Sequence, residues 1–120
     1  MPILVANLSS GKGTWGQLTR IINDNNWDKV ILVTTEFGRD NFKPLKKVEY
    51  IIIDPSFFSL TKLISTLKNA FKELIGNELE VSLNFISGTG KEHMAIISAL
   101  IQAGISFRLI ALTGEGIKSI

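Results

Sequence analysis

Five runs of apolar residues are spaced along the chain, each of a length suited to one β-strand. The run at 29–35 is rich in β-branched side chains and has apolar residues on both sides of the alternation. That composition is typical of a parallel strand buried on both faces. The five predicted strands are residues 2–7, 29–35, 48–53, 79–85 and 105–112.

Between these runs, apolar residues recur at helical spacing. In the segment 57–75 they fall at i, i+3, i+4 and i+7, with lysines and a glutamate off the stripe, which predicts an amphipathic helix. Ser56 is the predicted N-cap of this helix, and Gly76 is its predicted end. The other predicted helices are 14–26, 92–103 and a short one within the polar connection 36–47.

This alternation of strands and helices predicts an α/β fold. We expect a single domain over 1–120, with a doubly wound, mostly parallel five-stranded sheet that is Rossmann-like and has helices on both faces. The usual strand order, 3-2-1-4-5, makes the first and fourth strands neighbours, so the loops after them lie side by side at the carboxyl edge. The tail 113–120 is predicted to be frayed or paired with another chain.

Composition narrows the classes of function. A net charge of +2 on 120 residues is too small for a surface that coats duplex nucleic acid. The chain has no cysteine, one histidine and no clustered acidic pair, so no ligand set for a metal is evident and no cofactor is predicted. No apolar run approaches the length of a membrane span, and cytoplasmic is the default compartment.

The first glycine-rich loop contains a dinucleotide-binding pattern. Gly11, Gly13 and Gly16 match G-x-G-x-x-G, and Glu36 follows Gly16 by 20 residues at the end of the second predicted strand. In that fingerprint the glycines let the backbone approach a pyrophosphate, and the acid binds ribose hydroxyls. The stretch from Asn7 to Gly11 is longer than the usual tight turn, and the alternative is that these glycines only make turns and that Glu36 is a solvated loop residue.

The second glycine-rich loop reads Ser87-Gly88-Thr89-Gly90-Lys91. It fails the P-loop pattern, which requires glycine where Phe85 stands and Ser or Thr where Glu92 stands. What remains is a turn of backbone N–H groups, two hydroxyls and an ammonium at a helix start, all suited to a phosphodiester. An ordinary turn with a helix cap is the alternative.

The segment 84–112 resembles the hallmark region of CRISPR-associated Rossmann-fold domains, which sense cyclic oligoadenylate. Ser87, Gly88 and Lys91 match that family's loop by type and place, Met94 supplies its methionine, and Thr89-Gly90 inverts its usual glycine-threonine pair. In the first loop, small polar residues contribute to the same site in that family. The residues in that place here are Ser9, Ser10 and Gly11.

This resemblance implies a homodimer whose two-fold axis passes through the bound ring, with the apolar helix 92–103 at the subunit contact. Some members of the family cleave the ring without metal, by attack of a ribose 2′-hydroxyl on its own adjacent phosphate. The resemblance implies Lys91 as charge stabiliser and Ser10 or Ser9 as the group that orients the ribose or phosphate. Lys12 either reaches a phosphate or is solvated. Whether this chain cleaves or only binds stays open.

The remaining aromatic and basic candidates are weaker. His93, the single histidine, stands in the first turn of the last helix, where a surface position is more common than a catalytic one. Trp15 and Trp27 are predicted to pack, whereas Phe37 and Phe42 are the better candidates for base stacking. Three hypotheses therefore stand: a cyclic-oligoadenylate domain, a small dinucleotide-binding module, and a structural or regulatory partner whose glycines only make turns.

Overall fold

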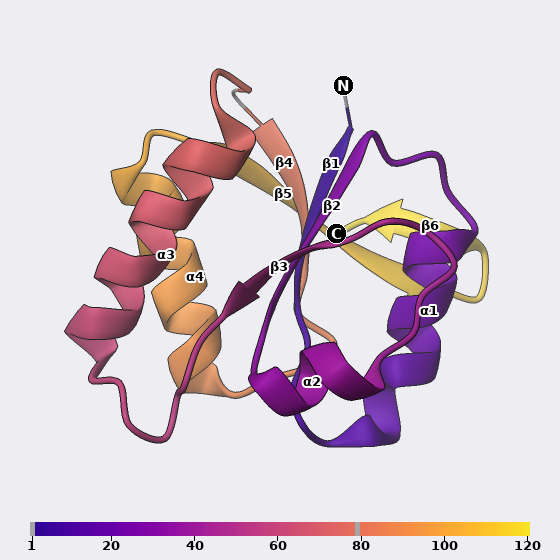
Figure 1. Ribbon diagram of the computed structural model, residues 1–120. Coiled ribbons are helices and arrows are strands. Elements are labelled where there is room, and N and C mark those ends of the chain that lie inside the picture. Colours follow the sequence, from indigo (N-terminus) through magenta and orange to yellow (C-terminus); the bar gives the residue numbers. More distant parts are fainter. Residues whose placement is uncertain (1, 79) are drawn as a thin grey trace.

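The computed structural model describes residues 2–78 and 80–120, which form one sheet of six strands in the order β3-β2-β1-β4-β5-β6 (Figure 1). Neighbouring strands from β3 to β5 are parallel, and β6 is antiparallel to β5. The α/β class and the predicted order of the first five strands are confirmed. The strands are β1 (Ile3–Asn7), β2 (Lys29–Thr34), β3 (Glu49–Ile52), β4 (Glu80–Asn84), β5 (Ser106–Thr113) and β6 (Gly116–Ser119). The first residue of the predicted strand 79–85 lies outside the described residues.

Helices cover both faces of the sheet. In Figure 1, α3 (Leu60–Ile75) and α4 (Gly90–Gln102) lie on one side and α1 (Trp15–Asn23) on the other. The short α2 (Glu36–Asn41) contacts β2 and β3, and a single 3-10 turn (Lys12–Thr14) precedes α1. No helix within the described ranges is long and apolar enough to cross a membrane.

The core has two layers because the central strands are apolar on both faces. On β1, Ile3 and Val5 join the buried cluster under α3 and α4, whereas Leu4 and Ala6 join the cluster under α1. Successive side chains of a strand point to opposite faces, so this alternation fixes the strand between two helical layers. A shift of register by one residue would exchange the two sets.

The C-terminal tail forms a sixth strand, so the prediction of a frayed tail or of pairing with another chain is wrong. Gly116–Ser119 pair with β5 of the same chain, from Thr113 opposite Gly116 to Ile110 opposite Ser119. Gly116 has a φ of 99°, which glycine adopts without steric cost. Ile117 packs against the cluster under α1, and this apolar contact accounts for the tail folding back.

The helix predicted at 57–75 begins later, at Leu60. The N–H groups of Phe57 and Phe58 both donate to the carbonyl of Asp54, at 3.1 and 2.8 Å, so residues 55–58 form a turn. Ser59 is the N-cap, and its hydroxyl accepts from the Lys62 N–H at 3.1 Å. The prediction of Ser56 as the cap is therefore wrong, because the Asp54 turn extends past it.

Replacing the two serines separately tests this assignment. Ser59→Ala is expected to lower the free energy of unfolding by about 1 kcal/mol, because the first turn of α3 loses its side-chain acceptor. Ser56→Ala is expected to change it by less than about 0.5 kcal/mol. Urea denaturation followed by circular dichroism measures both. Equal losses for the two variants would contradict the assignment.

Candidate functional site

The two glycine-rich loops meet at the carboxyl edge of the sheet. β1 and β4 are parallel neighbours, so the loops that follow them leave the sheet side by side. The Ser9 N–H donates to the Ser87 hydroxyl at 2.7 Å, and that hydroxyl donates to Ser9 Oγ at 2.9 Å. Two segments 78 residues apart are thereby joined through small polar groups.

The side chain of Asn7, the last residue of β1, contacts the residues that position the two loops. Its carboxamide is fully buried, and Nδ2 donates to the Val33 carbonyl at 3.0 Å and to Glu92 Oε2 at 3.4 Å. Its Oδ1 has no hydrogen-bond partner among the described residues. A Cβ placed on Gly88 would lie 1.5 Å from this oxygen, and Gly88 has a φ of 105°. Glycine is therefore required at position 88 on both counts.

The first turn of α4 is capped by its own side chains. Thr89 and Glu92 form a capping box, in which the Thr89 N–H donates to Glu92 Oε1 at 2.9 Å and the Glu92 N–H to Thr89 Oγ1 at 3.3 Å. The N–H groups of Gly90 and Lys91 have no partner within the helix by its geometry. Among the backbone N–H groups predicted to bind a phosphodiester, that of Thr89 is therefore already hydrogen-bonded, whereas those of Gly90 and Lys91 remain for an anion.

His93 holds the second loop in place. Its Nε2 lies 2.8 Å from the Ser87 carbonyl, and its ring stacks on Phe85 with centroids 4.2 Å apart. A carbonyl only accepts, so Nε2 carries the hydrogen. His93 thus joins the first turn of α4 to the second loop, and the structure gives it a positioning role.

Lys91 lies in the second loop as predicted, but its ammonium points to another segment. Nζ donates to the carbonyls of Pro55 and Phe58, at 3.0 and 2.8 Å. The side chain thus connects the start of α4 to the turn between β3 and α3. It is exposed, so an anion bound at the loops competes with these two carbonyls for it.

The first loop is fixed by Trp15. The indole N–H donates to the Ser9 carbonyl at 2.9 Å. The Lys12 ammonium lies 5.7 Å from the Trp15 ring centroid and 5.6 Å from that of Phe37, within the range of a cation–π contact. Ser10, which follows Ser9 in the chain, is exposed. Ser10 and Lys12 are therefore placed at the rim of the loop.

The backbone conformation does not require glycine at the three positions of the G-x-G-x-x-G pattern. Gly11, Gly13 and Gly16 all lie outside the positive-φ region. A Cβ on Gly13 or Gly16 would meet nothing within 4 Å. In the dinucleotide fingerprint the third glycine serves close packing of helix against strand, and that packing is not found at Gly16.

The four aromatic candidates divide into packing and exposed residues. Phe42 is only 3% exposed and meets Trp15 edge-on at 5.6 Å, so the prediction of base stacking by Phe42 is wrong. Trp27 donates from Nε1 to the Ile21 carbonyl at 2.8 Å and packs on the core. Phe37 is 45% exposed and is the one of the two phenylalanines available to a ligand.

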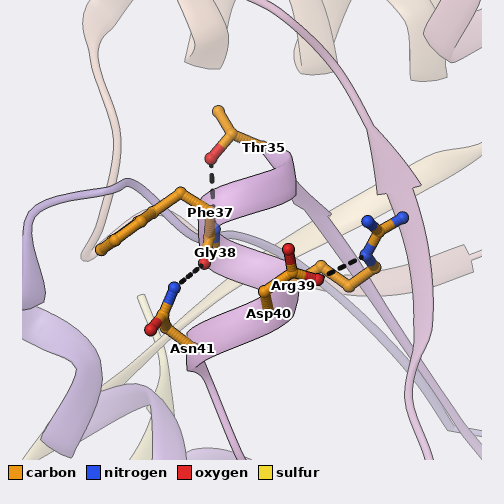
Figure 2. A network of polar contacts seen from close by, with 6 residues as sticks. All are labelled: Thr35, Phe37, Gly38, Arg39, Asp40 and Asn41. Atoms are coloured by element: carbon orange, nitrogen blue, oxygen red, sulfur yellow. Dashed lines mark hydrogen bonds and ion pairs between the residues drawn. The ribbon is translucent and has the colours of Figure 1, made fainter.

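A cavity of about 430 Å³ opens beside Phe37, at the carboxyl ends of β2 and β3. Thr35 caps α2 by accepting from the Gly38 N–H at 3.2 Å, and Phe37 and Arg39 leave the helix on opposite sides (Figure 2). Glu36, the predicted ribose ligand, faces this cavity. Its lining is Thr35, Glu36, Phe37, Ile52, Ile53, Asp54 and Phe58.

Sequence reasoning missed the asparagines that end β1 and β4. Asn84 repeats the role of Asn7, since its Nδ2 donates to the Ile110 carbonyl of the next strand at 2.9 Å and its Oδ1 accepts from the Ile86 N–H at 3.1 Å. A signal was present: each glycine-rich loop follows an apolar run with asparagine at its last or next-to-last position. In the sequence Glu92 only breaks the P-loop pattern, whereas in the structure it completes the capping box of α4.

Two further features of the described chain bear on the choice of site, namely possible metal ligands and a second cavity. No group of three His, Cys, Asp or Glu residues within 2–78 and 80–120 could hold a metal ion. A larger cavity, of about 820 Å³, lies at the opposite edge of the sheet, beside Pro2, Asp28 and Glu78. It contains none of the predicted site residues, so the carboxyl edge is the candidate site.

Comparison with known proteins does not identify a family for this chain. No protein-family model matches the chain, and no curated protein does. Among solved structures it is similar to the C-terminal domain of a hydrogenase from Pyrococcus furiosus, with 13% sequence identity, a TM-score of 0.48 and 90% of each chain covered.

Substitution of the loop glycines tests the geometry of this site. Gly88→Ala is expected to lower the free energy of unfolding by about 3 kcal/mol or more, because the methyl group meets Asn7 Oδ1 and φ is positive. Gly90→Ala, where a Cβ would meet nothing within 4 Å, is expected to be neutral or stabilising by up to about 1 kcal/mol. Urea denaturation compares the two, and a Gly88→Ala as stable as Gly90→Ala would contradict the Asn7 contact.

Proposed function

We propose that this chain binds cyclic oligoadenylate at the carboxyl edge of the sheet, as a homodimer acting in CRISPR antiviral defence in the cytoplasm. The observation that carries the proposal is the junction of the two glycine loops through Ser9 and Ser87. It lies beside the start of α4, where the N–H groups of Gly90 and Lys91 have no intrahelical partner. Small donors at a helix N-terminus suit a phosphodiester.

The roles of the loop residues follow from their positions. The hydroxyls of Ser9, Ser10 and Ser87 donate to phosphate oxygens or ribose hydroxyls, while Gly11 and Gly88 keep the backbone close to the ligand. Thr89 and Gly90 set the first turn of α4. The buried Glu92 carboxylate accepts from Thr89 and Asn7, which compensates part of its charge and lowers its repulsion of a phosphate.

Cleavage of the ring is the further step of this proposal. The ribose 2′-oxygen forms a bond to the adjacent phosphorus, the bond to the 5′-oxygen breaks, and the proton of the 2′-hydroxyl passes to the departing 5′-oxygen. The products are a 2′,3′-cyclic phosphate and a 5′-hydroxyl. Lys91 stabilises the phosphorane charge after exchanging the Pro55 and Phe58 carbonyls for a phosphate oxygen, and Ser10 orients the ribose.

The exposed side of α4 supports the homodimer. Met94 is 59% exposed and Ile101 is 64% exposed, and they lie on the same side of the helix by their spacing of seven residues. The opposite side, with Ala95, Ala99 and Leu100, is buried in the core. A second copy packed on the exposed stripe would bring two sets of loops to one ring.

The alternative is a dinucleotide-binding module that uses Gly11–Gly16 and Glu36. The position of Glu36 at the end of β2, facing a cavity, favours it. The absence of close packing or positive φ at Gly13 and Gly16 counts against it. Loss of free dinucleotide binding in Glu36→Ala, with Lys91→Ala unaffected, would favour this alternative.

Incubation with radiolabelled cyclic tetra-adenylate and cyclic hexa-adenylate, without metal, tests the proposal. We expect the ring to be retained on a native gel and linear product to appear on a denaturing gel. Loss of one charge stabiliser is expected to slow cleavage by about 100-fold or more in Lys91→Ala. Ser10→Ala is expected to slow it less, and the control Lys72→Ala on α3 should match the wild type.

Each outcome of that experiment has a distinct meaning. Retention without product identifies a sensor or a sponge and removes the cleavage step. Retention of neither ring contradicts the proposal and brings the dinucleotide alternative forward. If neither a ring nor a dinucleotide binds, the glycines serve as turns only.

The subunit contact is tested by a charge on the exposed stripe of α4. Ile101→Glu is expected to convert the dimer to a monomer, because a carboxylate cannot be buried there without a partner. Leu45→Glu, at an 88% exposed position in the connection between α2 and β3, is the control and should stay dimeric. Light scattering after size exclusion measures the mass. A wild-type monomer, with and without the ring, would contradict the dimer.

A further inference from the structure

We infer that the cavity between the α2 and β3–α3 segments is a nucleoside pocket, which takes the adenine and ribose of one unit of the bound nucleotide. This inference rests on the proposed function for the position of the phosphates, which we place at the two glycine loops. It assigns the cavity beside Glu36 to a base, whereas the dinucleotide fingerprint would use that residue for the ribose alone.

The lining of the cavity carries the inference. Two aromatic side chains, Phe37 and Phe58, and two carboxylates, Glu36 and Asp54, share a volume of about 430 Å³. Aromatic faces stack on bases of any kind. Carboxylates repel phosphate but accept from ribose hydroxyls and from the exocyclic amine of adenine. The combination excludes the phosphate end of a nucleotide and suits its nucleoside end.

The position of the cavity agrees with the length of a nucleotide. It lies at the ends of β2 and β3, and the serine junction lies at the ends of β1 and β4. The centres of these two strand pairs are two strand spacings apart, which is about 10 Å. A phosphate at the junction therefore leaves its own base within reach of Phe37 and Phe58.

Three lysines lie beside the aromatic walls of the cavity, and the Lys62 ammonium lies 5.3 Å from the Phe58 ring centroid. The Lys12 ammonium lies 5.6 Å from the Phe37 ring centroid. The Lys91 ammonium donates to the Phe58 carbonyl at 2.8 Å and to that of Pro55 at 3.0 Å, so it lies beside the turn that forms one wall, and from there it turns to a phosphate oxygen in the proposed cleavage step. The negative charge of a ligand is thus attracted to these lysines, and its neutral part faces the carboxylates.

Titration of ¹⁵N-labelled protein with adenosine 5′-monophosphate and with ribose 5-phosphate tests the pocket. Both probes carry the phosphate, and only the first carries a base. We expect both to shift the amide signals of Ser9 and Ser87, and only adenosine 5′-monophosphate to shift those of Phe37, Asp54 and Phe58. Identical shift patterns for the two probes would overturn the inference.

Phenylalanine substitutions provide the matched control. Phe58→Ala and Phe37→Ala are each expected to weaken adenosine 5′-monophosphate binding by about 10-fold through loss of stacking, with ribose 5-phosphate unchanged. Phe57→Ala, at an 87% exposed neighbour that does not line the cavity, should bind both probes as the wild type does. Phe37 is itself exposed, so its variant keeps the test valid if Phe58→Ala unfolds. Equal binding by all three variants would overturn the pocket.

Retention of cyclic tetra-adenylate separates the two proposals. If Phe37→Ala and Phe58→Ala retain the ring as tightly as the wild type, the pocket is overturned and the proposed function stands. If adenosine 5′-monophosphate shifts the pocket signals but no ring is retained, the pocket is supported and the proposed function is overturned.

Discussion

The buried carboxamide of Asn7 is the contact on which the geometry of the carboxyl edge depends. From the end of β1 it reaches β2 through Val33, α4 through Glu92 and the second loop through the close approach of Gly88. Burying an amide oxygen without a hydrogen-bond partner costs free energy of folding. That cost is offset only while the contacts with Val33, Glu92 and Gly88 are kept. The buried contacts of Asn7 therefore set the position of the second loop relative to the first.

Because the buried contacts of Asn7 hold the two loops, the polar groups that the loops offer to a ligand are already fixed in position. The hydroxyls of Ser9 and Ser87 bond to each other, and a ligand has to replace that bond with bonds of its own. Lys91 presents the same competition, since two backbone carbonyls already accept from its ammonium. A bound anion must therefore supply more than one contact, which favours a ligand with several phosphates over a single free phosphate.

The strands, their order and the meeting of the two loops could be predicted because they follow from periodicity and from the rules of parallel sheets. What escaped prediction depends on contacts between distant segments. β6 forms because Ile117 finds the cluster under α1, and the direction of Lys91 is set by carbonyls more than 30 residues earlier. Phe37 and Phe42 share one polar connection and both contact Trp15, yet Phe42 is buried in the cluster under α1 whereas Phe37 stays 45% exposed.

The distribution of charge along the edge adds a constraint that residue types alone do not show. Three lysines lie beside the aromatic walls of the α2 cavity, Lys12 at Phe37 and Lys62 and Lys91 at Phe58, and two carboxylates lie within it. A ligand with negative charge throughout its length is therefore attracted at the lysines and repelled at the carboxylates. A nucleotide carries its negative charge at the phosphate and its hydroxyl and amine groups at the nucleoside end. This distribution of charge supports the proposed nucleotide ligand over an inorganic polyphosphate, which carries negative charge throughout its length.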